Sequence, residues 1–358
     1  MHLTWALMNE WRKPRNRVNR FLLLILLFLF PVNLDAQSLT APVEYNLLFY
    51  NVENLFDVTD DPMTADDEFL SGGVRHWSYK RYQEKLNRVA KVLLASCGFD
   101  LPVIIGLCEV ENRLVLEDLT RKTALAAFNY RIIHKDSPDN RGIDVALLYR
   151  ADLILPLEYD YLPLKSQKEE IIHTREILYA VFCFPSQDSL HVFFNHWPSR
   201  YSGQAETESL RIRAANTLKN AVDRIRTNHT EARVVIMGDF NDQPLNKSLK
   251  DVLEARTENS TGQAGELINL SAGWAPRGTL KHQQSWQIFD QIIVSDYLLK
   301  GTGLSTTKNG ATIVDLPFLF EPDPRFKGKR LFRTYFGYKY QGGFSDHLPV
   351  RLKLQVND

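Results

Sequence analysis

The segment Arg233-Val-Val-Ile-Met-Gly-Asp-Phe-Asn-Asp242 says more about the fold of this chain than any other stretch. Its short apolar run, rich in Val and Ile, predicts a buried strand that ends at Gly238. Asp239 and Asn241 lie two residues apart on an extended chain, so they point the same way and together could bind a hard cation or orient a water. A plain turn explains this segment equally well, because Gly, Asp and Asn are turn formers.

Similar strand-like runs recur from residue 43 onward. They cover Tyr45–Tyr50, Val103–Cys108, Tyr130–His134, Val145–Tyr149, Ile177–Phe184, His191–Asn195, Arg233–Met237, Ile288–Ser295 and Leu348–Leu354. Apolar residues at helical spacing predict one helix over Tyr82–Leu93, after Ser78 as N-cap, and another over Leu210–Ile225. Helices that do not alternate strictly with strands favour an α/β fold with mixed sheets. Without an internal repeat or a linker, residues 37–358 are predicted to form one domain.

The N-terminal residues 1–36 have the composition of a signal peptide. Basic residues up to Arg20 precede the apolar run Phe21–Val32, and Ala36 supplies a small residue before Gln37. This run of about a dozen residues is short for a membrane span, which needs roughly 20. We therefore expect an exported mature chain, periplasmic or secreted, that has no membrane span. A retained N-terminal anchor is the alternative.

Charge and cysteine content limit the possible partners. The 43 Lys and Arg residues equal the 43 Asp and Glu residues, but the first 36 residues carry a net +3, which leaves −3 for the rest. Contact with a nucleic acid would therefore need a local basic patch, since the overall field does not attract a polyanion. The three cysteines give neither a disulfide framework nor a zinc motif, so buried thiols are expected.

Two polar segments stand out between the strands. The segment Arg325–Tyr340 interleaves basic and aromatic side chains, which suits contact with phosphates and bases. An edge hairpin with exposed lysines explains the same pattern equally well. The segment Asp57–Asp67 holds five aspartates, and a solvated loop is favoured there over a calcium site.

Polar residues suited to metal and acid–base chemistry cluster at the ends of the predicted strands. They are Asn51, Glu109, Asn195, His196, Asp239, Asn241, Asp290, Asp346 and His347. So many strand ends that carry carboxylates, amides and imidazoles predict one converging site. Oxygen ligands without a thiolate cluster favour Mg²⁺, with Mn²⁺ or Ca²⁺ also possible, over Zn²⁺. A hard cation beside His and Asp is the equipment for hydrolysing a phosphate ester.

These residues, in their order along the chain, resemble the endonuclease/exonuclease/phosphatase superfamily. The likeness is greatest to the deoxyribonuclease I type and to bacterial extracellular nucleases, and it runs from about residue 44 to residue 354. Its most specific motifs are Gly238-Asp-Phe-Asn241 and Ser345-Asp-His347. The resemblance implies a four-layer sandwich, in which two packed mixed β-sheets are flanked by helices.

The resemblance also implies roles around the metal. Glu109 and Asn51 would hold the divalent cation, with Asp346 helping. Asp239 and Asn241 would orient the scissile phosphate and the attacking water, or bind a second ion.

For acid–base chemistry, the resemblance implies two histidines that flank the phosphate as general base and acid. His347 would pair with Asp290, and His196 would pair with a carboxylate, for which Asp144 is the candidate. A carboxylate on the second ring nitrogen fixes the tautomer of such a histidine.

Three further residues are candidates for contact with the substrate. Arg175 resembles the arginine that grips the phosphate, where its fork geometry suits paired oxygens. Arg141 could equally touch the phosphate, and Asn195 precedes one of the two histidines.

The leading expectation is an exported, divalent-metal-dependent phosphodiesterase with nucleic acid as its substrate and no stable protein partner. The alternative keeps the chemistry but changes the substrate: a sphingomyelinase-like phosphodiesterase, or a phosphatase for a lipid or small phosphate ester. A catalytically inactive binding module would have lost Glu109, Asp239 or His347, and all three are present.

Overall fold

The computed structural model describes residues 42–201, 203–257 and 265–357, which belong to one compact unit, Pro42–Asp358. The predicted signal peptide, residues 1–36, lies outside the described residues. None of the helices in the described part of the chain has the length and apolar character needed to cross a membrane.

One of the two large sheets contains the first strand of the described chain. In spatial order its strands are β14 (Gly303–Ser305), β20 (Val350–Asn357), β1 (Glu44–Leu55), β2 (Ile104–Val110), β4 (Asp144–Arg150) and β3 (Tyr130–Ile133), with β15 (Ala311–Ile313) also paired to β20. The central pair β1–β2 is parallel, whereas its neighbours β20 and β4 run antiparallel to it. This sheet is therefore mixed, as the sequence predicts.

The second large sheet contains the strand part of the segment Arg233–Asp242. Its strands, in spatial order, are β5 (Leu155–Leu162), β6 (Ile177–Cys183), β7 (Ser189–His196), β8 (Arg233–Asp239), β13 (Asp290–Ser295), β10 (Leu267–Asn269) and β9 (Ala255–Arg256). β7 and β8 are parallel, and β13 pairs antiparallel to β8. Each large sheet thus has a parallel pair at its centre, and the carboxyl ends of those pairs can share one edge.

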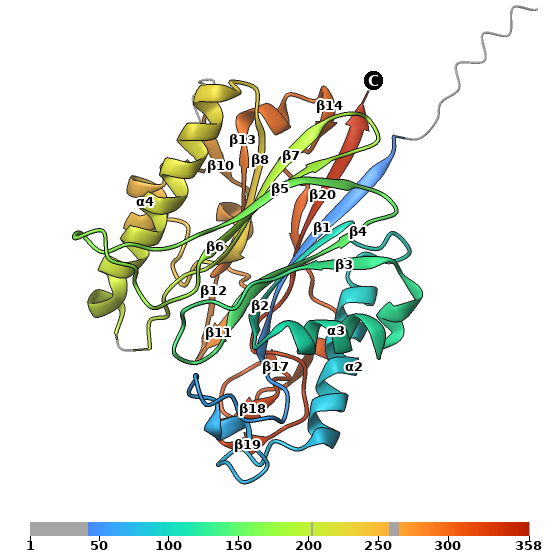
Figure 1. Ribbon diagram of the computed structural model, residues 1–358, viewed down its shortest axis with the longest axis vertical. Helices are drawn as coiled ribbons and strands as arrows, with labels where there is room; N and C mark the ends of the chain where they lie inside the picture. The colour runs from blue at the N-terminus through green and yellow to red at the C-terminus, as the bar shows by residue number, and fades with distance from the viewer. Residues whose placement is uncertain (1–41, 202, 258–264, 358) are drawn as a thin grey trace, which may run out of the picture. The chain divides into compact units, whose positions relative to one another are not determined.

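Three apolar layers show how the sheets and helices pack. Leu47 and Phe49 of β1 pack with residues of β7 and β8 between the sheets, while Leu48 and Tyr50 face the opposite way. That opposite face is covered by α2 (Tyr79–Ala95) and α3 (Arg113–Arg121), and α4 (Gln204–Asn228) covers the outer face of the second sheet. Figure 1 shows α4 on one flank and α2 and α3 on the other. The predicted four-layer sandwich is confirmed.

The helices begin and pack as their sequences dictate. The Ser78 hydroxyl accepts a hydrogen bond from the Arg81 amide at the start of α2, which is the predicted N-cap. In α4, Ala214, Leu218 and Val222 are buried at helical spacing. Neither α3 nor the edge strand β5 is predicted from the sequence pattern, since α3 is only nine residues long and most of β5 is exposed.

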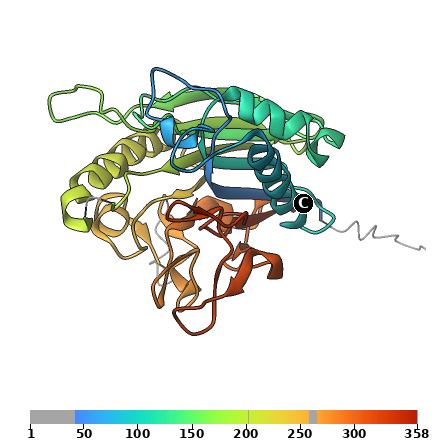
Figure 2. The same cartoon turned by 90° about the horizontal axis from the view of Figure 1, so that it is seen from below.

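Short hairpins and turns complete the described chain. The hairpins are β11 (Leu280–His282) with β12 (Ser285–Gln287), β16 (Phe320–Pro322) with β17 (Lys329–Leu331), and β18 (Tyr335–Phe336) with β19 (Lys339–Tyr340). Short 3-10 turns lie at Asp67–Phe69, Ala124–Ala127, Ala272–Trp274, Asp296–Leu299 and Pro317–Leu319, and a π-helical turn lies at Ser248–Val252. The orange and red segments that carry the hairpins gather on one side in Figure 2.

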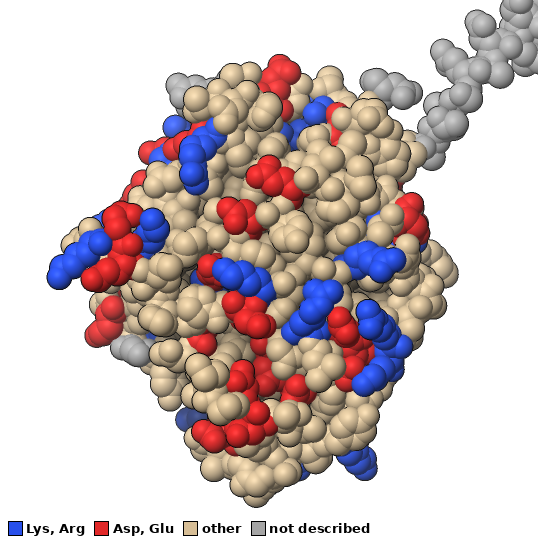
Figure 3. Space-filling model, viewed as in Figure 1, with Lys and Arg blue, Asp and Glu red and all other residues tan. Residues whose placement is uncertain are grey.

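The acidic segment Asp57–Asp67 is only partly the solvated loop that was predicted. Asp60, Asp61 and Asp67 are exposed, but Asp57 and Asp66 are buried. Both buried carboxylates accept backbone N–H groups, Asp57 from Thr59 and Asp66 from Asp61, which stabilises the turn from within. Figure 3 shows acidic side chains gathered over the lower part of the view, where this segment lies.

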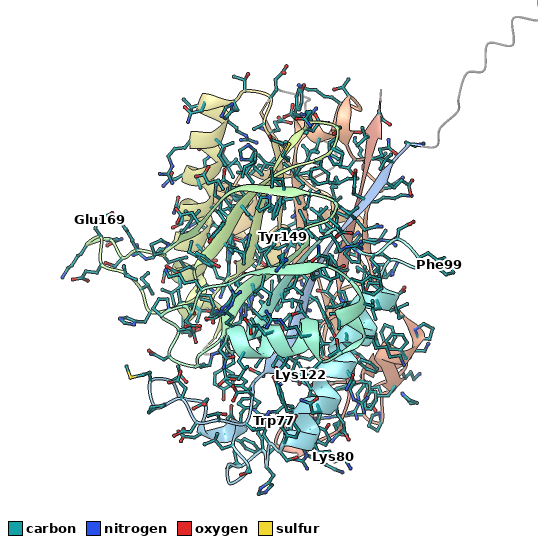
Figure 4. The ribbon with its side chains drawn as sticks, turned by 45° about the vertical axis from the view of Figure 1, so that its right-hand side comes forward. Trp77, Lys80, Phe99, Lys122, Tyr149 and Glu169 are labelled. Carbon is teal, nitrogen blue, oxygen red and sulfur yellow. The ribbon has the colours of Figure 1, made fainter. Side chains whose placement is uncertain are left out.

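Side-chain packing is uneven over the described unit. In Figure 4 Tyr149, a partly buried residue that packs against the core between the sheets, lies near the middle of the view, while Glu169 lies at the tip of the projecting β5–β6 connection. The ends of the parallel strands, rather than this projecting loop, therefore offer rigid positions for a site.

One partly buried histidine makes the fold sensitive to acid. The Nδ1 atom of His191 on β7 lies 2.8 Å from the Tyr179 hydroxyl, and its ring stands 6.4 Å from that of His229. Burial, helped by the nearby His229, lowers the pKa of His191 to about 4. An unfolded chain titrates this group at about 6.5. The neutral His191 side chain therefore stabilises the folded state fully above about pH 6.5. This stabilisation is lost as the pH falls toward 4, because the unfolded chain then binds a proton at this histidine that the folded protein does not.

We predict that His191→Phe reduces the loss of stability between pH 7 and pH 4.5, because the substituted ring has no proton to gain. Urea unfolding at both pH values measures the difference. His173→Phe, which replaces an exposed imidazole, is the control and should keep the wild-type pH dependence. An equal loss of stability in His191→Phe and wild type would contradict the assignment.

Candidate active site

The two large sheets are joined at their strand ends by one buried amide. Asn51 Nδ2, just before the irregular last part of β1, donates to Glu109 Oε1 at 3.2 Å and to Asp239 Oδ2 at 3.1 Å. Glu109 belongs to β2 in the same sheet, whereas Asp239 ends β8 in the other. The predicted convergence of these strand ends is therefore present in the structure.

The backbone is distorted where the candidate residues lie. Glu109 has a φ of 61° and Asn241 has a φ of 50°, both in the left-handed region, which glutamate rarely adopts and asparagine tolerates. The pairing of β2 with β4 shifts register between Cys108 and Val110, so that Glu109 sits in a β-bulge. A bulge re-aims a side chain, and backbone strain of this kind concentrates at functional sites.

Gly238 permits the close approach of β7 and β8 beside the site. A Cβ at this position would collide with the backbone oxygen of Asn195 on the neighbouring strand. The glycine in the Gly-Asp-Phe-Asn motif is thus required by packing, and it places Asp239 directly opposite His196 in the strand register.

Two imidazoles lie on either side of Asp239. His347 Nδ1 lies 2.7 Å from Asp290 Oδ2, which is the pair that the family resemblance implied. The Nε2 atoms of His347 and His196 each lie 3.8 Å from Asp239 Oδ2. His196 Nε2 is also 3.8 Å from Glu109 Oε1.

The two histidines prefer opposite charge states. Burial alone lowers the pKa of His347, but the carboxylates of Asp290 and Asp239 outweigh it and raise the pKa well above its usual value. Burial, with the positive charges of Arg175 and Arg141, lowers the pKa of His196 well below its usual value. One site therefore holds an imidazolium donor and a neutral imidazole acceptor.

Asp239 is an unusual carboxyl group in this setting. Burial raises its pKa to about 7, with a further contribution from Asp290, against the opposing effect of His347. A group with a pKa near the working pH is suited to accept or donate a proton.

Asp144 is not the partner of His196, and that prediction is wrong. Its carboxylate lies 2.8 Å from His134 Nε2 and accepts the Ser137 amide at 2.8 Å. The segment before β4 resembles the family pattern only weakly, so the sequence did not indicate that His134, at the end of β3, lies closer to Asp144. The carboxylates nearest His196 are Glu109 and Asp239.

The donor atoms at this site fit a hard divalent cation. Ligand atoms of Asp239, Asp290 and His347 all lie within 4.8 Å of one another. The buried Asp290 Oδ1 has no hydrogen-bond partner among the described residues. Glu109, with its side chain 16% exposed, faces the same cluster and remains open to a ligand. Carboxylate oxygens in this number suit Mg²⁺, Mn²⁺ or Ca²⁺.

Two of the predicted metal ligands are already engaged in hydrogen bonds. Asn51 turns its amide nitrogen toward the carboxylates, while its oxygen accepts the backbone N–H of Glu53 at 3.0 Å. Asp346 Oδ2 lies 2.7 Å from Arg333 Nη2. As arranged here, Asn51 positions the carboxylates, and Asp346 is tied to a guanidinium beside them.

The three predicted substrate contacts differ in their accessibility. Arg175 is buried, and it donates to Asp139 at 2.7 Å and to the Trp197 carbonyl at 2.9 Å. The amide of Asn195 is also buried, between Met237 and Trp197. Arg141 has a half-exposed side chain, so its guanidinium is the most accessible of the three groups.

A buried network of charged side chains lies beside the site and is not predicted from the sequence. Glu53 accepts Arg333 Nε at 3.1 Å and the Thr334 amide at 2.6 Å, and Lys85 Nζ of α2 donates to the Phe344 carbonyl at 2.6 Å. Burial lowers the pKa of Lys85 to about 8. The available signal was a lysine on the apolar face of a predicted helix, three residues after Tyr82.

A family model and a group of solved structures match this chain. The model, described as the endonuclease/exonuclease/phosphatase family, matches residues 46–356. No curated protein sequence matches the chain.

Three solved structures illustrate the likeness in fold. An endonuclease/exonuclease/phosphatase family protein from Bacteroides thetaiotaomicron is 16% identical with a TM-score of 0.54, covering 88% of this chain and 99% of its own. A mannosyl-6-phosphatase from the same organism is 15% identical with a TM-score of 0.54, covering 87% and 99%. D. rerio TDP2 complexed with a single-strand DNA product is 13% identical with a TM-score of 0.51, covering 87% and 98%.

We predict that Asp290→Asn lowers the pKa of His347 in protein from which metal has been removed with EDTA, because the amide no longer stabilises the imidazolium. NMR titration of the imidazole measures the shift. Asp144→Asn makes the same change at the other histidine–aspartate pair, His134, and should leave the His347 titration as in wild type. An unchanged His347 pKa in Asp290→Asn would refute the pairing as the cause.

Proposed function

The chain belongs to the endonuclease/exonuclease/phosphatase family, and from that premise we propose that it is a divalent-metal-dependent phosphodiesterase that cleaves nucleic acid. Family membership supports hydrolysis of phosphoester bonds. The observation that carries the proposal is the placement of His347 and His196, with Nε2 atoms each 3.8 Å from one oxygen of Asp239.

The charge states at the site suit the two proton transfers of hydrolysis. Asp239 can orient the attacking water, and the neutral His196 imidazole beside it can accept the water proton. The His347 imidazolium, held in place by Asp290, can donate a proton to the leaving oxygen as its bond to phosphorus breaks. Neutral His196 supplies an acceptor on the other side of the same carboxylate.

Glu109 and Asp239 would hold Mg²⁺, with Asp290 near enough to assist. The ion would neutralise charge on the non-bridging phosphate oxygens. Asn51 would hold Glu109 and Asp239 at a fixed separation through its two hydrogen bonds. Asn241, whose side chain donates to the Trp197 carbonyl, would stabilise the turn that carries Asp239.

A second candidate function is phosphatase activity on a small phosphate ester. The similar solved structures include both a sugar phosphatase and a protein with a bound DNA product, so the fold alone does not select the substrate. The net charge of −3 beyond the first 36 residues also gives no general electrostatic attraction for a polyanion such as nucleic acid. Nucleic acid is preferred because basic and aromatic side chains border the site.

We predict that the purified mature protein nicks supercoiled plasmid in the presence of Mg²⁺ and that EDTA abolishes the nicking. His347→Ala and Asp239→Ala should each lower the rate by about 10²–10⁴-fold, the range for lost acid–base or electrostatic assistance. Gel assays of plasmid conversion measure these rates. His173→Ala removes an exposed imidazole as the control, and wild-type rates in either site variant would contradict the assignment.

A substrate panel separates the two candidate functions. Plasmid, RNA, sphingomyelin and a sugar phosphate are incubated with the same protein while Mg²⁺, Mn²⁺ and Ca²⁺ are exchanged. Turnover of a sugar phosphate or of sphingomyelin without cleavage of any nucleic acid would reject the nuclease function and keep the chemistry.

We also propose that the protein is exported after removal of residues 1–36. N-terminal sequencing of protein recovered from the periplasm or medium of an expressing bacterium should then begin at Gln37. Recovery of the full-length chain with the cell membranes would instead support a retained anchor.

A further inference from the structure

We propose that a cavity beside the catalytic residues is a subsite for an anionic group and the planar ring attached to it, such as the nucleotide next to the scissile phosphate. The cavity has a volume of about 240 Å³. This inference rests on the proposed function and specifies its substrate as an extended nucleotide chain rather than a lone phosphate ester.

The cavity lies directly beside the catalytic residues. Asp346, which precedes His347, lines it together with Arg333. Leu280 of β11 pairs with His347 in an isolated β-bridge, and the Leu348 amide donates to the Thr279 carbonyl at 2.8 Å. The hairpin β11–β12 is therefore attached directly to the strand end that carries the catalytic imidazole.

The wall opposite β11 is fixed by a buried ion pair. Lys281 Nζ lies 2.6 Å from Asp323 Oδ2 and donates to the Lys329 carbonyl at 2.9 Å. The two charged side chains are only 6% and 5% exposed. These contacts of Lys281 thus join the hairpins β11–β12 and β16–β17 into one wall, which favours a preformed cavity.

Among the basic residues of the wall, Arg325 is the one available to a ligand. Arg330 pairs with Glu321 at 2.7 Å, and Arg333 pairs with Glu53 and Asp346. Arg325 is exposed and forms no ion pair among the residues that the structure describes. Its guanidinium can therefore bind a phosphate without first leaving a carboxylate.

An exposed aromatic ring completes the subsite. Phe336, at the end of β18, lines the cavity and is 55% exposed. The Arg330 guanidinium lies over this ring, 5.1 Å from its centroid. A ring in this setting can stack on a base, which suits a nucleic acid better than an acyl chain, because charged side chains outnumber the apolar Phe326 and Leu331 in the rest of the wall.

The size of the cavity agrees with a single nucleotide unit. Its volume lies slightly below the range of roughly 300–1,000 Å³ for pockets that enclose drug-sized ligands. One ring and one anionic group would therefore fill it, while further nucleotides would lie outside. The interleaved segment Arg325–Tyr340 thus contributes two specific contacts rather than a uniformly basic surface.

The test compares a short single-stranded oligodeoxynucleotide with bis(p-nitrophenyl) phosphate, a small diester that offers no neighbouring nucleotide. For Arg325→Ala, which removes the phosphate contact, and Phe336→Ala, which removes the stacking contact, we expect kcat/KM on the oligonucleotide to fall by about 5- to 100-fold, mainly through KM. The loss on the small diester should be at least about tenfold smaller. Arg121→Ala and Tyr338→Ala remove exposed side chains of the same types outside the cavity and should lower neither activity.

Binding supplies a readout that does not need turnover. Fluorescence anisotropy of the labelled oligonucleotide with the His347→Ala protein should show weaker binding when Arg325→Ala is added, with the salt slope reduced by about 0.7 for one lost phosphate contact. Equal losses on both substrates, or unchanged oligonucleotide binding and turnover in both variants, would overturn the subsite.

Failure of the proposed nuclease function can be distinguished from failure of the proposed subsite. If wild-type protein hydrolyses neither substrate, the proposed function fails while anisotropy still decides whether Arg325 and Phe336 bind the oligonucleotide. If wild-type protein hydrolyses both substrates and the variants behave like the controls, the proposed function stands and the subsite is rejected.

Discussion

The site depends on one hydrogen-bonded amide that connects two sheets. Asn51 donates to a carboxylate of its own sheet, Glu109, and to a carboxylate of the other, Asp239. Two carboxylates held this close repel each other unless a donor or cation lies between them. The packing of Leu47 and Phe49 against the second sheet brings the carboxylates of Glu109 and Asp239 together. The apolar core thereby holds two charged groups at a separation that they would not keep in water.

Burial then gives chemically similar groups different roles. The two histidines near Asp239 have opposite pKa shifts. Burial, helped by nearby arginines, lowers the pKa of His196, whereas the carboxylates of Asp290 and Asp239 outweigh burial and raise the pKa of His347. Left-handed backbone at Glu109 and Asn241 places side chains where regular strands would not, and the surrounding sheet bears the cost of that strain. The reacting groups are therefore preorganised by the fold before any substrate binds.

The family fold indicates the reaction, hydrolysis of a phosphoester, more firmly than it indicates which substrate is bound. Strand ends supply the reacting groups, whereas the hairpins between β13 and β20 and the β11–β12 hairpin form the wall beside them. Ion pairs within that wall cancel most of its positive charge and leave Arg325 and Phe336 as its accessible contacts. Specificity in such a protein rests on a few side chains of the connecting segments, not on its net charge.

The sequence by itself determined nine of the strands, two of the helices, the mixed sheets and the motifs at the strand ends. Those features follow from local periodicity and from residues near one another in the chain, as in Gly238-Asp-Phe-Asn241. The tertiary structure decided which side chains meet. It paired Asp144 with His134, engaged Arg333 with Glu53, and turned the amide of Asn51 toward two carboxylates. Such partners lie up to 280 positions apart, and a bulge of one residue redirects a side chain, so local pattern cannot specify them.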